Sequence, residues 1–167
     1  MKQKILIGVL IVAGLASIAY AAFSQALVVN GTGTTTGNWD VKITGITNSA
    51  STGATQVNGS PTFTATSATF NTNLAYPGAS ATYDITVKNQ GSINAKLDTI
   101  SDIATINATA PTDIKYTVTG VTAGTTTLAA GTTNTITVKV EWLATSTLAT
   151  SATKSATITL NYIQNTP

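Results

Sequence analysis

Apolar and polar residues alternate along most of the chain after residue 37, with the two-residue period of a strand that has one buried face. The alternation is clearest over 133–142, where Ile136, Val138, Val140 and Trp142 share one face. Weaker versions of the same pattern predict further strands, over 38–47, 80–88, 94–101, 113–121 and 155–163.

The stretch 61–71 is also strand-like, but its apolar residues change face between Phe63 and Phe70, which predicts a bulge or a break. Glycine, proline and asparagine mark turns between the alternating stretches, and no helical period follows residue 29. Short strands separated by turns predict an all-β fold. We expect a single antiparallel β-sandwich, jelly-roll-like, over residues 38–167.

The first 21 residues have the three parts of a secretory signal peptide. Lys2 and Lys4 precede an uncharged apolar run over 5–19, and the run closes on Ala19-Tyr20-Ala21. Cleavage is therefore expected between Ala21 and Ala22, with export of the chain. The alternative is a retained membrane anchor, because residues 5–29 exceed the ~20 apolar residues that span a bilayer.

The segment after the cleavage site, residues 22–30, is short, apolar and capable of forming a strand. It carries no charge, and a Gly/Thr-rich hinge over 31–37 follows it. A subunit that lends a strand to a neighbour would begin in this way. Phe23, Leu27 and Val29 share one face and are the expected anchors. The predicted donor strand comprises Ala22, Phe23, Ala26, Leu27, Val28 and Val29. The edge beside 133–142, the longest apolar face, is the expected acceptor.

Charge is scarce in this chain. Charged residues make up 8% of it, against ~25% in ordinary soluble domains. The eight basic residues are all lysines; removal of Lys2 and Lys4 leaves six against six acidic residues, a net charge of zero. A surface of this kind lacks the basic footprint of a nucleic-acid-binding protein, and low charge favours association.

Catalytic groups are lacking as well. The chain has no histidine and no cysteine, which excludes His/Cys zinc sites and the usual nucleophilic triads. Its carboxylates do not form a calcium-loop pattern. Residues 31–37 lack the lysine and the strand-to-helix setting of a phosphate loop. We expect no enzyme, no cofactor, no metal and no small-molecule substrate. Asn30, Asn58 and Asn107 begin Asn-x-Ser/Thr sequons and are possible glycosylation sites in a host that modifies exported proteins.

Several motifs together resemble the TasA/camelysin family of secreted fibre subunits. They are Ala22-Phe23-Ser24 after the signal peptide, the strand from Gly37 to Ile43, the Tyr76-Pro77-Gly78 turn and the Asn89-Gln90-Gly91-Ser92 segment. Leu128–Gly131 before the strand ending in Trp142 is similar to a later family motif. Bacterial members carry more charge, and the Thr/Ala/Asn bias here resembles archaeal TasA-like bundling pili.

The resemblance implies a structural subunit of an extracellular filament, a pilus or a biofilm-matrix fibre. Its partner would be itself: each subunit's N-terminal strand would complete the next subunit, and fibres would bundle laterally. The family's metallopeptidase label is not carried over to a chain without histidine. The alternative is a membrane-anchored adhesion or carbohydrate-binding module, with Trp39 or Tyr76 at a sugar site. The mass of the extracellular protein separates these readings, since a start at Ala22 indicates cleavage.

Overall fold

The computed structural model describes residues 31–57, 59–148 and 152–165. One compact unit spans Thr36–Pro167, and we call it the body. Residues 31–35 belong to a separate unit; they are exposed and have neither helix nor strand. The expected signal peptide and donor strand lie outside the described residues. Within the described ranges, no helix is long and apolar enough to cross a membrane.

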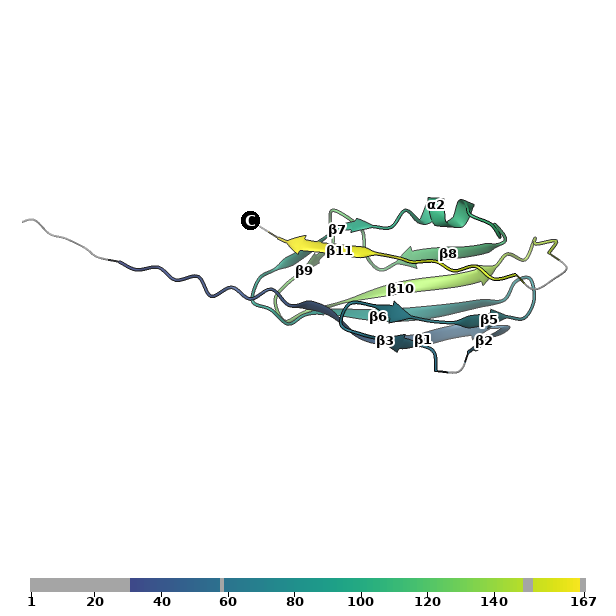
Figure 1. Ribbon diagram of the computed structural model, residues 1–167, viewed down its shortest axis with the longest axis horizontal. Coiled ribbons are helices and arrows are strands. Elements are labelled where there is room, and N and C mark those ends of the chain that lie inside the picture. Colours follow the sequence, from purple (N-terminus) through teal and green to yellow (C-terminus); the bar gives the residue numbers. More distant parts are fainter. Residues whose placement is uncertain (1–30, 58, 149–151, 166–167) are drawn as a thin grey trace, which may run out of the picture. The chain divides into compact units, whose positions relative to one another are not determined.

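The largest sheet of the body has four antiparallel strands in the order β1-β6-β10-β8 (Figure 1). β6 alternates strictly between half-buried and buried residues, and β10 does so from Ile136 to Glu141, as the sequence pattern predicts. Ile136 pairs with Ile85 and Val138 with Tyr83, so the apolar faces of β6 and β10 coincide. The four strands are β1 (Val41–Thr52), β6 (Ser80–Asn89), β8 (Ile114–Thr119) and β10 (Thr133–Trp142).

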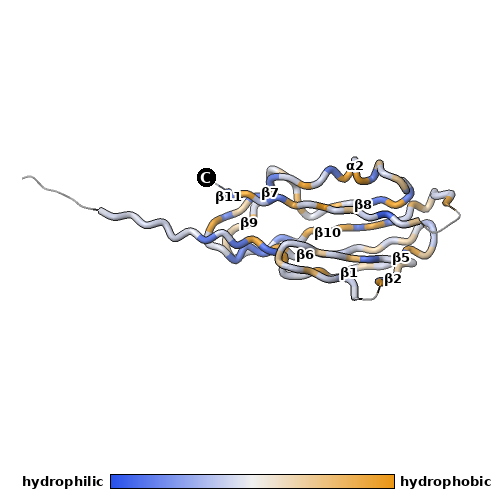
Figure 2. Tube along the Cα trace, in the orientation of Figure 1, coloured by the Kyte–Doolittle hydropathy of each residue, from blue (hydrophilic) through white to orange (hydrophobic). Residues whose placement is uncertain are grey.

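A second antiparallel sheet has the order β11-β7-β9, and two small two-stranded sheets pair β2 with β5 and, as a hairpin, β3 with β4. Ala95 and Leu128 of this sheet are buried in the same apolar cluster as Tyr83 and Ile136 of the larger sheet. Figure 2 shows apolar positions alternating along these strands. The bounds are β2 (Ala54–Gln56), β3 (Thr62–Phe63), β4 (Ala68–Thr69), β5 (Thr72–Leu74), β7 (Ala95–Ile100), β9 (Thr127–Leu128) and β11 (Leu160–Gln164).

The all-β prediction is confirmed, and the break expected within 61–71 is present as the gap between β3 and β4. The strand predicted over 155–163 is correct only from Leu160 onward.

The expectation of no helix was wrong, because α2 spans Ile103–Ala108. Asp102 caps it by accepting bonds from Ala104 N (3.0 Å) and Thr105 N (3.3 Å). The Thr105 hydroxyl and these amides hold the pKa of Asp102 below its ordinary value. Six residues are too few to show a helical period.

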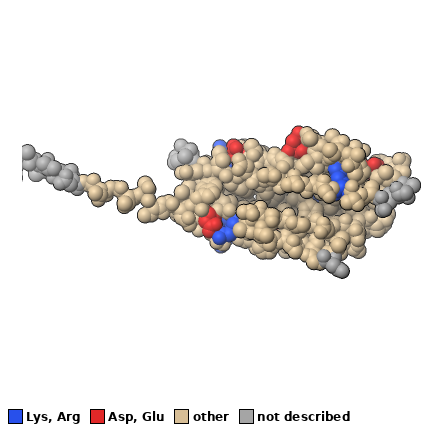
Figure 3. Space-filling model, in the orientation of Figure 1, with Lys and Arg blue, Asp and Glu red and all other residues tan. Residues whose placement is uncertain are grey.

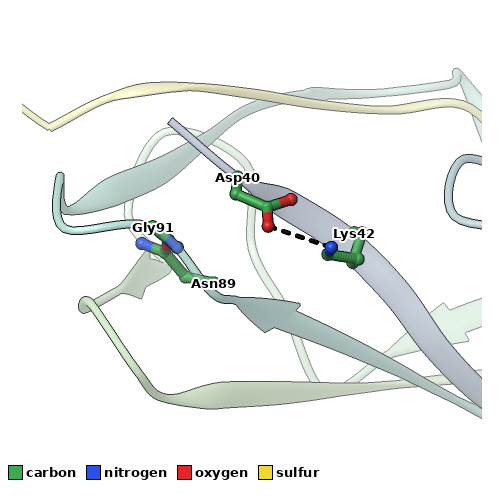
Figure 4. Close-up of polar contacts among 4 residues, drawn as sticks. All are labelled: Asp40, Lys42, Asn89 and Gly91. Carbon is green, nitrogen blue, oxygen red and sulfur yellow. Dashed lines mark hydrogen bonds and ion pairs between the residues drawn. The ribbon is translucent and has the colours of Figure 1, made fainter. Parts of the chain in front are cut away.

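A hydrogen-bonded turn at the end of β6 positions the start of the body (Figure 4). Asn89 is fully buried; its Nδ2 donates to Ile93 O (2.8 Å) and Leu128 O (3.1 Å), and its Oδ1 accepts from Gly91 N (3.0 Å). A Cβ on Gly91 would lie 2.7 Å from Asp40 N and closer still to Asn38 O, so only glycine lets the chain pass this closely. The turn therefore fixes where residues 38–40 enter the body.

Candidate functional site

A groove of ≈ 1310 Å³ runs along the apolar face of the four-stranded sheet. Its floor includes Ile136, Val138 and Val140 of β10, together with Ile85 and Val87 of β6. The ring of Phe70 stacks on Tyr83 at a centroid distance of 4.4 Å and continues the apolar lining. In Figure 3 the surface is hollowed between the C-terminal segment and the β3–β5 stretch. These five floor side chains are themselves buried, each at most 7% exposed, as core residues are.

Unpaired strand edges border the groove on both sides. Residues 152–160 line one side, and 65–75 line the other. Among the described residues, β11 pairs only with β7, β4 only with β3, and β5 only with β2. Alternate residues of the C-terminal side, Ala156, Ile158, Leu160 and Tyr162, pack against the apolar cluster. The groove therefore has strands paired on one side only beside an apolar floor, which is the setting that strand addition requires.

The four-stranded sheet, in contrast, has its outer edges partly covered. At the β8 edge, the Asn107 amide donates to Tyr116 O and accepts from Tyr116 N, each at 2.8 Å, as a neighbouring strand would. At the β1 edge, Ile43 N donates to Ala65 O at 2.8 Å. The expected acceptor edge beside β10 was wrong, because β10 pairs with β6 on one side and β8 on the other. Among the described residues, the strands that border the groove and pair on one side only are β4, β5 and β11.

Lys154 holds the start of the C-terminal side of the groove. Its Nζ donates to the carbonyl oxygens of Thr109 (2.8 Å) and Ile114 (3.1 Å), and those of Asn107 and Pro111 lie within 3.3 Å. Desolvation, and then the charge of Lys115, lowers the pKa of Lys154. The Tyr116 hydroxyl donates to Lys154 O (2.9 Å), and burial raises the pKa of Tyr116. These bonds tie the segment to β8 at the Trp142 end of the sheet.

Two buried polar atoms on groove-lining residues have no hydrogen-bond partner among the described residues: Trp142 Nε1 and Tyr162 Oη. Burial raises the pKa of Tyr162, and the nearby Asn134 amide partly offsets that effect without forming a bond of acceptable geometry. A buried, unpaired donor costs about 1–3 kcal/mol, so a water molecule or another polar group should pair with each of these atoms. Asn134 and Trp142 lie eight residues apart on β10, or ~26 Å, so the two atoms mark opposite ends of the groove.

The residues singled out from the sequence are placed unevenly. Ala21, the donor-strand residues, Asn30 and Asn58 lie outside the described residues. Asn107 is described, and its amide nitrogen already donates a hydrogen bond to Tyr116 O of β8. A glycan on that nitrogen would replace one of its two hydrogens, so only one would remain to make the bond. Trp39 is 43% exposed and lines the groove, whereas Tyr76 is 50% exposed and lies beside Gly53. The structure does not bring the two rings into one site.

Sequence reasoning did not identify the free edges of β4 and β5, or the two unpaired atoms. A partial signal existed, because Trp142 and Tyr162 each occupy the apolar face of an alternating stretch while carrying a polar atom.

Charged groups are sparse and scattered over the face seen in Figure 3. Two ion pairs are present among the described residues, Lys42–Asp40 at 2.9 Å and Lys139–Glu141. Within the same ranges, no three His, Cys, Asp or Glu side chains gather as metal ligands would. A partner in the groove would therefore be held by apolar contacts and hydrogen bonds rather than by ion pairs.

Comparisons of the chain with protein-family models, with curated proteins and with solved structures found no match.

Proposed function

We propose that this protein is the structural subunit of an extracellular filament that polymerises head-to-tail by strand donation. Residues 22–29 of one subunit would occupy the groove of the next. In this proposal the two larger sheets and the two small two-stranded sheets form one incomplete, jelly-roll-like sandwich, which the donated strand completes. Its resemblance to TasA-like fibre subunits is part of the same proposal.

The observation that carries the proposal is the groove itself, an apolar floor bordered on both sides by unpaired strand edges. An incoming strand gains main-chain hydrogen bonds along these edges, while alternate side chains enter the apolar floor. A contact between two different surfaces of the same chain does not close on itself unless a ring forms, and it therefore builds a fibre.

The anchors of residues 22–29 supply enough apolar surface for this contact. Burial of each of Phe23, Leu27 and Val29 contributes roughly 1.5–3 kcal/mol, several kcal/mol in total before the cost of ordering the segment. The neutral, threonine-rich surface, with 36 threonines in 167 residues, suits lateral packing of fibres because little charge repulsion opposes it.

The test is deletion of residues 22–29 behind an intact cleavage site, with fibres examined by electron microscopy and the N-terminus sequenced. We expect wild-type fibres whose subunits begin at Ala22, and a deletion variant that remains folded but unpolymerised. A matched control keeps the length of the segment and replaces Phe23, Leu27 and Val29 by serine; it should also fail to polymerise. Fibres of normal length from the deletion variant would refute strand donation. Detergent-extracted monomers with an intact Met1 would support the membrane-anchored alternative.

A further inference from the structure

We infer that Gln25 of the donated segment pairs with Tyr162 of the receiving subunit, and that the segment runs antiparallel to residues 154–164. The inference rests on the proposed function and adds the direction and register of the donated strand. Two observations carry it: the unpaired Tyr162 hydroxyl at one end of the groove, and the position of the single polar residue on the anchor face of the segment.

Gln25 lies on the same face as Phe23, Leu27 and Val29, because strand residues two apart point the same way. When those anchors enter the groove, the Gln25 amide enters with them. A buried amide requires partners. Tyr162 lines the groove, and its buried Oη, which can both donate and accept, has no hydrogen-bond partner among the described residues. The Asn134 side chain of β10 lies near this hydroxyl.

The direction follows from where the body begins. Asn38 N donates to Ser92 Oγ (2.9 Å), and Val41 pairs with Asn89, so the chain enters the body at the Asn89 end of the sheet. Lys154 and Trp142 lie at the opposite end. In head-to-tail stacking, the segment of the following subunit reaches the groove at this opposite end and extends toward Tyr162. The donated segment then runs in the opposite direction to residues 154–164. The two segments can therefore pair as antiparallel strands, with hydrogen bonds perpendicular to the strand direction.

The register follows from matching faces. With Gln25 opposite Tyr162, Leu27 lies opposite Leu160 and Val29 opposite Ile158, so each anchor adjoins an apolar side chain that already packs against the core. A shift of two residues would place Gln25 beside Leu160 and leave Tyr162 beside Phe23, with the hydroxyl still unpaired. A shift of one residue would bring Ser24, Ala26 and Val28 inward and leave the large anchors in water.

The natural absence of cysteine makes disulfide trapping a direct test. Full-length chains carrying Leu27→Cys with Leu160→Cys, or Val29→Cys with Ile158→Cys, should give covalent ladders on denaturing gels of oxidised fibres. Directly opposed residues lie ~4.5–5.5 Å apart at Cα, within disulfide reach, whereas diagonal pairs lie ~7–8 Å apart. Matched controls join Leu27→Cys to Ile158→Cys or Tyr162→Cys, and Ala26→Cys to Leu160→Cys. These should give no ladder.

A second measurement addresses the side-chain pair itself. Gln25→Leu and Tyr162→Phe should each raise the critical concentration for fibre growth about 2- to 12-fold, the equivalent of one hydrogen bond. The double variant should fall well short of the product of the two effects, because the two residues form one interaction.

Covalent ladders from a control cysteine pair in normal fibres would overturn the register. So would a critical concentration of the double variant equal to the product of the two single effects. Either result would leave strand donation intact. Absence of fibres from the wild-type chain would instead remove the proposed function.

Discussion

Gly91 lies where the chain enters the body, and its replacement by alanine should destabilise that junction. The added Cβ would lie 2.7 Å from Asp40 N and nearer to Asn38 O, both backbone atoms that cannot rotate away. Gly91 does not have a positive φ, so the effect comes from crowding and not from backbone strain.

The magnitude follows from the bonds that hold residues 38–40 in place. Displacement of this backbone would break Gln90 N to Asp40 O (2.7 Å), Ser92 N to Asn38 O (2.9 Å) and Asn38 N to Ser92 Oγ (2.9 Å). At about 0.5–1.5 kcal/mol each, loss of the three bonds lowers the free energy of unfolding by about 1.5–4.5 kcal/mol. That is a large part of the ~5–15 kcal/mol of an ordinary domain.

Urea denaturation followed by circular dichroism measures this loss on the full-length chain with residues 22–29 left in place and assembly prevented by dilution. Gly45→Ala is the matched control, because its Cβ would meet only Thr86 side-chain atoms at 3.9 Å. We expect the control to leave the free energy of unfolding within about 0.5 kcal/mol of wild type, because the added methyl meets only ordinary van der Waals contacts. Equal midpoints for Gly91→Ala and Gly45→Ala would refute the close-approach argument.

Two further substitutions test buried polar groups of the body. Asn89→Asp sets a carboxylate against the carbonyls of Ile93 and Leu128 and should lower the free energy of unfolding by roughly 3 kcal/mol or more at pH 7. Burial should raise the pKa of the new carboxyl, so urea melts should show a smaller loss at pH 4, and an equal loss at both pH values would contradict this account. Burial also raises the pKa of Tyr116, so the unfolded chain ionises first near pH 10 and stability should fall as pH rises above 10. Tyr116→Phe should flatten that part of the pH profile, and an unchanged slope would show that other groups cause it.

The strands that sequence alone predicts best are those whose alternation is enforced by burial. β6 and β10 are central in their sheet, so nearly every second residue is apolar and the periodic signal is clear; Asn89 and Asn134 are the exceptions. The C-terminal segment was predicted as one strand from 155, yet residues 155–159 keep only the alternation of exposure and lack a ladder. The alternation of side chains indicates which face is buried. A hydrogen-bonded ladder also requires the backbone of a neighbouring strand, which the alternation does not show.

The groove was harder to predict than the strands, because its walls depend on contacts between distant segments. Nothing local in 65–75 shows that β4 and β5 have one neighbouring strand each within the described part of the chain, and nothing local in α2 shows that Asn107 covers the β8 edge. The longest apolar face was therefore mistaken for the open one. Apolar length identifies the centre of a sheet, and open edges are set by topology.

The small number of charges in the body affects how its stability depends on salt concentration. Screening acts on charges, and its range shrinks from ~30 Å at 0.01 M salt to ~3 Å at 1 M. The two described ion pairs are partly exposed and contribute little at any salinity. Apolar burial is strengthened by excluded salts such as sulfate, and backbone ladders carry no net charge to screen. The fold should therefore tolerate fresh water and brine alike, with concentrated salt tightening rather than dissolving it.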